Sequence, residues 1–237
     1  MSKNTVASKM EQSTRERVYS NQGNMPLITL LSGSYERILD IGCGAGDNAR
    51  LIKSINSKCD LFGITHSESE AAFAQAHMAK CWVVDIETKF PDDLAGQTFD
   101  AIIFSHVLEH LRDPVEVLNR ASKMLHVGGQ ILIAVPNVLS WRMRLQFLRG
   151  DFQYQPAGVL DDTHLHFYTY RTAHQSLLAK SPDLKTLVNV VSGNVPLWWL
   201  RRHIFPRLWC ERIDKLGCQY WPNLFGDQVL ISAVKQY

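Results

Sequence analysis

The 237-residue sequence lacks the features that identify several large classes of protein. Its cysteines form no CxxC pair, so the sequence indicates neither a disulfide framework nor a zinc site. No apolar run is long enough to cross a bilayer, and the polar first twenty residues lack the apolar segment of a signal peptide. We therefore expect no integral membrane segment and a cytoplasmic location. We also expect reduced thiols that pack as small apolar side chains at Cys43, Cys59, Cys81, Cys210 and Cys218.

An excess of charge of one sign is also absent. The net charge is +2, which is too balanced for a protein whose main partner is nucleic acid, because phosphate binding needs a strongly basic surface. There is no GK[ST] sequence of a P-loop and no GxGxxG of a dinucleotide site. The hydrophobic share of 46% and the charged share of 20% are typical of one globular domain of this length.

Apolar runs alternate with helical patterns over the first 137 residues. Expected strands lie at 37–42, 59–65, 81–86, 99–105 and 128–137, and expected helices lie at 47–55, 67–78 and 113–125. Ser67 is a candidate N-cap, and Pro114 stands in the first turn of the third helix. Because each strand is apolar throughout, we expect a parallel sheet that is covered on both faces.

The pattern changes after residue 137. Residues 138–168 are irregular, 169–180 predict a helix with Thr169 as its N-cap, and 186–193 and 228–235 predict two final strands. The long aromatic and basic segment 194–226 separates these strands, and such a loop is usually a lid or a binding element. We divide the chain into an N-terminal arm, 1–34, and a main domain, 35–237, with lid segments at about 138–168 and 194–226.

The sequence LDIGCGAGD is the most informative local motif. A strand ends there, and Gly42, Gly44 and Gly46 allow the backbone to approach a ligand closely before a helix begins. In open parallel sheets, ligands lie beyond the carboxyl ends of the strands. Asp40, on the strand just before the turn, strengthens this interpretation. The alternative is that the glycines only close a tight turn between strand and helix.

At this point the chain resembles the class I S-adenosylmethionine-dependent methyltransferases, and most closely their small-molecule branch of UbiG-like and MetW-like enzymes. The resemblance runs from about residue 35 to 183 and rests on ILDIGCGAGDNA, VVDIE, FDAIIFSHVLEHLRDPVEVL and MLHVGGQILIAVPN. It implies an α/β, Rossmann-like, doubly wound sheet of seven strands, mostly parallel with a C-terminal antiparallel hairpin. It also implies that the N-terminal arm covers the site of the cofactor, S-adenosyl-L-methionine.

The resemblance further implies roles for single residues in binding that cofactor. Asp40 would lie near its methionine part, with the backbone of the Gly42, Gly44 and Gly46 turn beneath. Asp85 would accept a hydrogen bond from the adenine amino group, and Ile86 would pack against the ring. Ser105 and His106 would line the sulfonium side. The family usually carries an acidic residue at the end of the second strand, where it grips the ribose hydroxyls of the cofactor. This chain has Thr65 in that slot, whose single hydroxyl would make a weaker, neutral hydrogen bond to the ribose.

The stretch VLDDTHLHFYT, residues 159–169, places Asp162, His164 and His166 two residues apart. In an extended chain they would face the same way, as a metal site, an acid/base cluster or ordinary packing. No fourth ligand is obvious from the spacing, so we expect no metal. The resemblance places this stretch at the substrate entrance, where His166 fills a slot that is commonly arginine. His164 is then either a catalytic base or a pin that holds the loop to LEHL.

A second group of candidates lies in SHVLEHL. If a helix begins near Val107, His106 and His110 share a face. In the family layout His106 opens toward the site, which makes it our second catalytic candidate after His164. Glu109 and His110 recur in relatives with different substrates, which favours a structural or cofactor-side role.

Two segments interleave aromatic residues with arginines: WRMRLQFLRGDFQY and PLWWLRRHIFPRLW. They could form a lid helix whose Trp and Leu side chains pack on the core, an apolar pocket with cations at its mouth, or a peripheral membrane surface. We favour packing of the lid. Trp141, Asp162 and His164 are the expected substrate contacts.

The sequence therefore predicts a methyltransferase that transfers a methyl group to an oxygen or nitrogen of a small molecule, such as a specialised metabolite. The acceptor is expected to be amphiphilic or anionic, and the oligomeric state stays open. Methylation of nucleic acid is disfavoured because SHVLEH replaces the NPPY-type motif after the fourth strand. The alternatives are a non-catalytic partner subunit with the same fold and a nicotinamide-dependent oxidoreductase.

Overall fold

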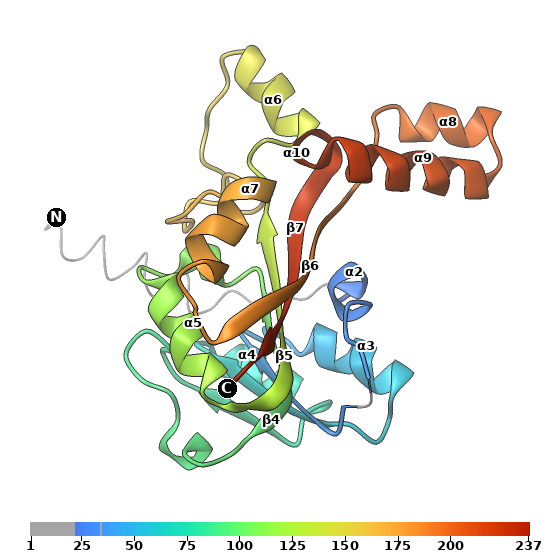
Figure 1. Ribbon diagram of the computed structural model, residues 1–237. Coiled ribbons are helices and arrows are strands. Elements are labelled where there is room, and N and C mark those ends of the chain that lie inside the picture. The colour runs from blue at the N-terminus through green and yellow to red at the C-terminus, as the bar shows by residue number, and fades with distance from the viewer. Residues whose placement is uncertain (1–21, 34) are drawn as a thin grey trace, which may run out of the picture.

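The computed structural model describes residues 22–33 and 35–237, and these residues fold around one seven-stranded sheet (Figure 1). The strand order is β3-β2-β1-β4-β5-β7-β6. The first five strands pair in parallel, whereas β7 runs antiparallel to both β5 and β6. The predicted fold class is confirmed. The strands are β1 (Arg37–Ile41), β2 (Asp60–Thr65), β3 (Lys80–Val83), β4 (Phe99–Ser105), β5 (Leu125–Pro136), β6 (Leu184–Gly193) and β7 (Gly226–Lys235).

The helices begin where the capping chemistry of the sequence predicts. The Ser67 hydroxyl accepts the backbone N–H of Glu70, the Asp113 carboxylate caps the helix that Pro114 opens, and Thr169 caps the helix that begins at Tyr170. The helices are α2 (Met25–Ile28), α3 (Asp47–Ile55), α4 (Glu68–Ala74), α5 (Pro114–Ser122), α6 (Trp141–Leu148), α7 (Tyr170–Ala173), α8 (Trp198–Ile204), α9 (Arg207–Tyr220) and α10 (Pro222–Phe225). Short 3-10 turns are η1 (Asp92–Leu94) and η2 (Leu108–His110), and a π turn, η3 (His174–Leu178), extends α7.

The core consists of two apolar clusters, one on each face of the sheet. Neighbouring residues of β1 divide between them: Leu39 packs with α5 and η3, whereas Ile38 packs with α2 and α3. This division follows from the pleat, since successive side chains of a strand point to opposite faces. Burying each such side chain contributes roughly 1.5–3 kcal/mol. Both faces are therefore covered, and the strand ends remain as the place for a site.

The C-terminal lid departs from the expectation. Helices α8 and α9 form a hairpin that projects beyond the sheet (Figure 1). None of the residues of α8 is buried, and Trp198, Trp199 and Trp209 are all exposed. The predicted packing of these aromatic side chains on the core is wrong. The reason is that the hairpin projects beyond the sheet, so no core lies beneath these side chains, and Arg201 of α8 pairs with Asp214 of α9 at 2.6 Å.

Within residues 22–33 and 35–237, no helix has the length and apolar character needed to span a bilayer. The expected N-terminal arm falls largely on residues 1–21, which lie outside the described residues. Its described part begins at Gln22 and includes α2, which packs its buried Leu27 and Ile28 against the sheet.

Candidate functional site

The carboxylate of Asp40 is the most unusual group at the carboxyl end of β1. Asp40 is 1% exposed, and among the described residues neither carboxylate oxygen has a hydrogen bond of good geometry, although the Asn48 side chain lies nearby. Burial raises the pKa of Asp40 to about 7, although the nearby Asn48 side chain offsets part of this rise. A buried carboxyl group without a partner is costly, and a cationic ligand at the strand end would offset that cost.

The glycine turn follows directly. Gly42, Gly44 and Gly46 have φ values of 75°, 51° and 84°, which L side chains rarely adopt. A Cβ on Gly42 would lie 2.2 Å from a methyl carbon of Val107. Gly46 in turn opens α3 from a left-handed conformation. These positions need glycine for the turn itself, so Asp40, more than the glycines, distinguishes a ligand site from a tight connection.

The end of β2 carries Thr65, which is hydrogen-bonded to a carboxylate from the following helix. Thr65 is buried and donates its hydroxyl hydrogen to Glu70, over 2.6 Å to Oε2. Glu70 lies in the first turn of α4 and is itself buried. A carboxylate therefore lies beside the slot where the sequence places only Thr65.

The residues after β3 are divided between solvent and core. Asp85 is exposed, and its Oδ1 accepts the backbone N–H of Glu87 at 2.9 Å. Ile86 is buried, and its carbonyl accepts from the Arg120 guanidinium. An exposed carboxylate beside a buried apolar side chain suits an aromatic base with an amino edge.

A polar network links β4 to the N-terminal segment and to β7. The Asn24 side-chain amide donates to Ser105 Oγ at 3.4 Å and to Gln228 Oε1 at 2.8 Å. Gln228 donates back to Asn24 Oδ1 at 3.2 Å and accepts from His106 Nε2 at 2.9 Å. Gln228 pairs with Pro136 in the β5–β7 ladder, which brings it to the same sheet edge as Ser105.

His106 occupies a strained position at this edge. Its φ is 57°, in the left-handed region, and its side chain is 41% exposed. Nδ1 lies 3.4 Å from Oε1 of Glu109. Desolvation disfavours the charged imidazolium, but the Glu109 carboxylate and Gln228 outweigh it and raise the pKa of His106. The predicted helix from Val107 is wrong, because the chain makes only the 3-10 turn η2 there, and His106 and His110 do not share a helical face.

The segment 159–169 is not extended. It folds through turns, so Asp161 is buried, Asp162 is exposed, His164 is buried and His166 is half-buried. The suggestion that Asp162, His164 and His166 face the same way is therefore wrong. The loop is held to η2 by its backbone, since the N–H groups of Leu165 and His166 donate to the Glu109 carbonyl at 2.8 and 3.1 Å.

The third expected substrate contact, Trp141, opens α6. Its indole N–H donates to the Asn194 carbonyl at 3.1 Å, which ties one lid segment to the other. The roles of Trp141 and Asp162 as substrate contacts stay predictions.

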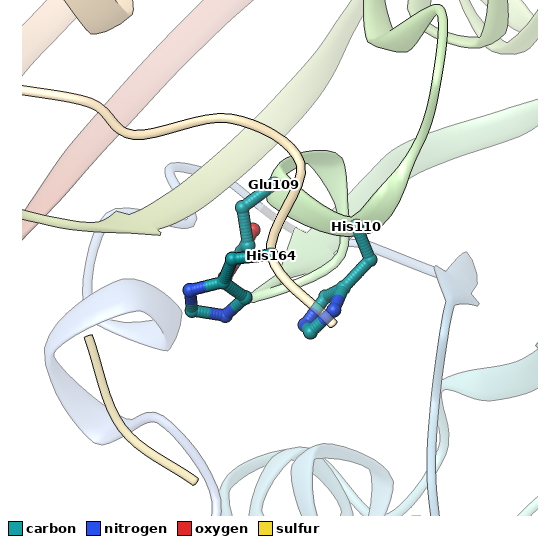
Figure 2. Close-up of side chains that lie close together, drawn as sticks. All are labelled: Glu109, His110 and His164. Atoms are coloured by element: carbon teal, nitrogen blue, oxygen red, sulfur yellow. The ribbon is translucent and has the colours of Figure 1, made fainter. Parts of the chain in front are cut away.

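The structure does bring His164 together with two residues of η2. Ligand atoms of Glu109, His110 and His164 all lie within 4.8 Å of one another, and the imidazole rings of His110 and His164 meet edge to face at 4.6 Å. Figure 2 shows the three side chains where η2 meets the loop. Burial lowers the pKa of His110. This cluster joins residues that the sequence leaves 54 positions apart, His110 and His164.

A cavity of about 380 Å³ lies elsewhere, between α7, β6 and α10. It is lined by Tyr170, Arg171, His174, Gln175, Asn189, Pro222 and Asn223. None of these residues belongs to the predicted site.

Comparison with known families decides which protein family the chain belongs to. The model of the family described as "Methyltransferase domain" matches residues 13–179, which is more than half of the chain. The chain belongs to this family. The methyltransferase-domain match spans β1 to β5, the glycine turn, η2 and the loop with His164.

Curated relatives of this methyltransferase-domain protein match part of its sequence. The ubiquinone biosynthesis O-methyltransferase of Rhizobium etli is 32% identical over 104 residues, which is 43% of this chain and 41% of that enzyme. That of Pseudomonas syringae is 30% identical over 108 residues, 43% of this chain and 45% of that enzyme. The match thus covers less than half the length of these relatives.

Solved structures extend the likeness over the full chain. A SAM-dependent methyltransferase from Archaeoglobus fulgidus superimposes with a TM-score of 0.56 at 21% identity, covering 99% of this chain and 95% of that one. The plantazolicin methyltransferase BpumL, solved in complex with SAH, gives a TM-score of 0.58 at 20% identity, covering 86% and 77%. At these identities the likeness concerns the fold.

Proposed function

We propose that the protein is an S-adenosylmethionine-dependent methyltransferase that acts on an oxygen of a small molecule. The observation that carries the proposal is the buried carboxyl group of Asp40, with only weak support from its neighbours, just before the glycine turn. Family membership supports the reaction class, and the partial match to O-methyltransferases supports oxygen over nitrogen.

The residues present fit the cofactor. Asp40 would attract its cationic methionine part, Glu70 with Thr65 would face the ribose, and Asp85 with Ile86 would hold the adenine. S-adenosylmethionine, when bound, supplies a methyl group that is already activated on sulfonium. The chain's own task is then positioning and exclusion of water, which can contribute much of the rate.

His106 and its network would orient the reacting groups. Gln228 and Asn24 tie His106 and Ser105 into one polar edge, so the imidazole is held at a fixed place beside the strand end. The loop 159–169 then covers the neighbouring side, with Asp162 exposed toward solvent. We choose an amphiphilic or anionic acceptor because the lid segment 194–226 carries exposed aromatic and arginine side chains, Trp198 and Arg202 among them. Aromatic side chains suit an apolar part of the acceptor, and arginines suit a negative charge.

Calorimetric titration of the full chain with S-adenosylmethionine, S-adenosylhomocysteine and NADH tests the class. We expect binding of the first two and none of NADH. Asp85→Ala should weaken cofactor binding by about 1 kcal/mol, or roughly fivefold, because one hydrogen bond to adenine is lost. Asp92→Ala, also exposed and close in sequence, is the matched control. Failure to bind either adenosyl compound would favour a non-catalytic subunit.

A screen of small hydroxylated acceptors for release of S-adenosylhomocysteine tests the acceptor. Turnover of a phenol or other hydroxyl compound supports the proposal, whereas turnover confined to amines would overturn the choice of oxygen.

A further inference from the structure

We propose that Cys43 and Cys81 are a site of reversible disulfide formation that controls the glycine turn of the proposed cofactor site. Their Sγ atoms lie 3.6 Å apart, although the two residues stand 38 positions apart in the chain. Formation of the disulfide is independent of the proposed function. Only its effect on the cofactor rests on that function.

This pair differs from the other cysteines of the chain. All five cysteines carry free thiols, and all five lie within the described residues. Cys59, Cys210 and Cys218 each direct the thiol to a backbone carbonyl, at 3.8, 3.9 and 3.6 Å. Within residues 22–33 and 35–237, Cys43 and Cys81 are therefore the two thiols that contact each other.

Gly63 of β2 makes the contact between the two thiols possible. Cys81 of β3 pairs with Gly63 in the sheet, and the backbone N–H of Cys43 donates to the carbonyl of Ile64 at 3.0 Å. Gly63 has no positive φ, so its backbone conformation does not require glycine. A Cβ at this position would lie 2.7 Å from Cys43 Sγ and would also collide with Met78 Sδ. The missing side chain thus leaves the space in which thiols from both neighbouring segments meet.

The two thiols differ in access and in acidity. Cys43 is 6% exposed, whereas Cys81 is half-buried on β3, an edge strand of the sheet. A hydrogen bond from the Cys43 thiol lowers the pKa of Cys81, against the opposing effects of burial and of the Asp40 and Glu70 carboxylates. The same hydrogen bond, together with burial, raises the pKa of Cys43. Because the thiolate is the nucleophile, Cys81 would react first with an oxidant.

A peroxide is the class of oxidant that fits this arrangement. The Cys81 thiolate attacks one peroxide oxygen, the O–O bond breaks, and the leaving hydroxide takes up the proton that Cys81 released, which gives a sulfenic acid and water. Cys43 Sγ then attacks the sulfenic sulfur, so that an S–S bond forms and the S–O bond breaks. The hydroxide that leaves combines with the thiol proton of Cys43 as a second water. Two electrons pass from the thiols to the peroxide, and a small dithiol returns them.

Disulfide formation would displace the glycine turn. An S–S bond is about 2.05 Å long, so the two Sγ atoms must approach each other by about 1.5 Å. Cys81 is held in the ladder between β2 and β3, whereas Cys43 stands between two glycines with positive φ, Gly42 and Gly44. The turn is therefore the part that moves.

The displacement would reach the groups that we assign to the cofactor. Asp40 of β1 pairs with Gly63 in register, so Asp40, Gly63 and Cys81 lie in one row across three strands. Binding groups must be held to within about 0.5 Å of their productive places, and a shift of the turn exceeds that tolerance. We therefore expect the oxidised chain to bind S-adenosylmethionine about tenfold more weakly or worse. If the thiols only fill space as small apolar side chains, oxidation would leave this affinity unchanged.

The test treats the reduced full chain with hydrogen peroxide, blocks the remaining thiols with an alkylating reagent and maps the peptides by mass spectrometry. We expect a cross-linked peptide that joins Cys43 to Cys81 and that dithiothreitol removes. Cys81→Ser and Cys43→Ala should lack this peptide. Cys218→Ser is the matched control, because Cys218 is half-buried like Cys81 but faces a carbonyl, and this variant should form the peptide as the parent does.

Calorimetry with S-adenosylmethionine is the second readout. The affinity of the parent and of Cys218→Ser should fall on oxidation and return on reduction, whereas that of Cys81→Ser and Cys43→Ala should not change. Melting temperatures of the reduced variants, compared with the parent, identify a variant that folds poorly, and the other variant of the pair then decides.

Three results would each overturn the proposal: no Cys43–Cys81 peptide in a parent chain whose other thiols are oxidised, equal affinity of the reduced and cross-linked chains, or the same loss of affinity in both variants that cannot form the disulfide. A reduced parent chain that does not bind S-adenosylmethionine would instead refute the proposed function and the control of the cofactor with it. The cross-linked peptide would still establish the disulfide, because mass spectrometry detects it without the cofactor.

Discussion

Thr65 and Glu70 form one buried unit, with the threonine hydroxyl donating to the glutamate carboxylate over 2.6 Å. The pair lies at the carboxyl end of β2, where the family resemblance leads us to expect an acid on the strand itself. Here α4 brings the carboxylate, because its N-cap Ser67 starts the helix so that Glu70 falls in the first turn.

Glu70→Gln should therefore lower the affinity for S-adenosylmethionine. Loss of a charged acceptor costs about 1.5–3 kcal/mol, which is roughly a tenfold to hundredfold weaker dissociation constant by calorimetry. Glu68→Gln, on an exposed position of the same helix, should bind normally. Equal affinity in both variants would remove Glu70 from the cofactor site.

The stability of the cofactor-free chain should fall as pH rises, because of Asp40. Its folded pKa of about 7 is raised from 3.8, so its contribution is fully present below 3.8 and is lost as pH rises through about 7. Linkage puts this loss on the order of 4 kcal/mol between pH 4 and 8. The check is to measure the free energy of unfolding at several pH values for the parent chain and for Asp40→Asn. The difference between the two slopes against pH belongs to Asp40.

The stability of the cofactor-free chain should fall as pH rises, whereas its affinity for the cofactor should increase. A cationic ligand favours the ionised carboxylate, so binding should tighten between pH 6 and 8 in the parent chain and not in Asp40→Asn. A parent profile as flat as that of the variant would contradict the assignment of Asp40.

His106 should be more easily replaced by glycine than by alanine. Its φ of 57° costs an L residue about 1 kcal/mol, which glycine avoids. Melting temperatures should therefore rank His106→Gly above His106→Ala, although both lose the contact with Gln228. Both should lower turnover, and a variant with full turnover would exclude His106 from orienting the reactants.

His164→Ala should lower turnover by about a hundredfold or more if His164 acts as a catalytic base, and it should lower cofactor affinity far less. Steady-state kinetics beside calorimetry separates the two quantities. His166→Ala, half-buried in the same loop, should change turnover far less. Unchanged turnover in the His164 variant would reject a catalytic role.

Arg201 should hold the projecting hairpin together. It donates to the carbonyls of Val195 and Pro196 and pairs with Asp214 at 2.6 Å, in a partly buried position. Arg201→Ala should lower the free energy of opening the hairpin by about 1–3 kcal/mol, so limited proteolysis should cut between α8 and α9 earlier than in the parent chain. Exposed Arg202→Ala should stay within about 0.5 kcal/mol of the parent. Equal protease resistance in both would show that the pair does not stabilise the hairpin.

The sequence by itself determined what depends on neighbouring residues. The apolar runs fixed the strands, Ser67, Pro114 and Thr169 fixed helix starts, and the turn from Gly42 to Gly46 followed Asp40. Each of these features is set by sterics, capping or periodicity within a few positions, so it can be predicted without the fold.

Only the tertiary structure decided which distant side chains meet. The register of β7 against β5 brings Gln228 to Asn24, 204 positions away, and backbone docking of the loop brings His164 to Glu109 and His110. The pairing of Arg201 with Asp214 in a hairpin whose Trp residues on α8 stay exposed is of the same kind. Such contacts depend on how whole segments pack, and spacing along the chain carries no record of that packing.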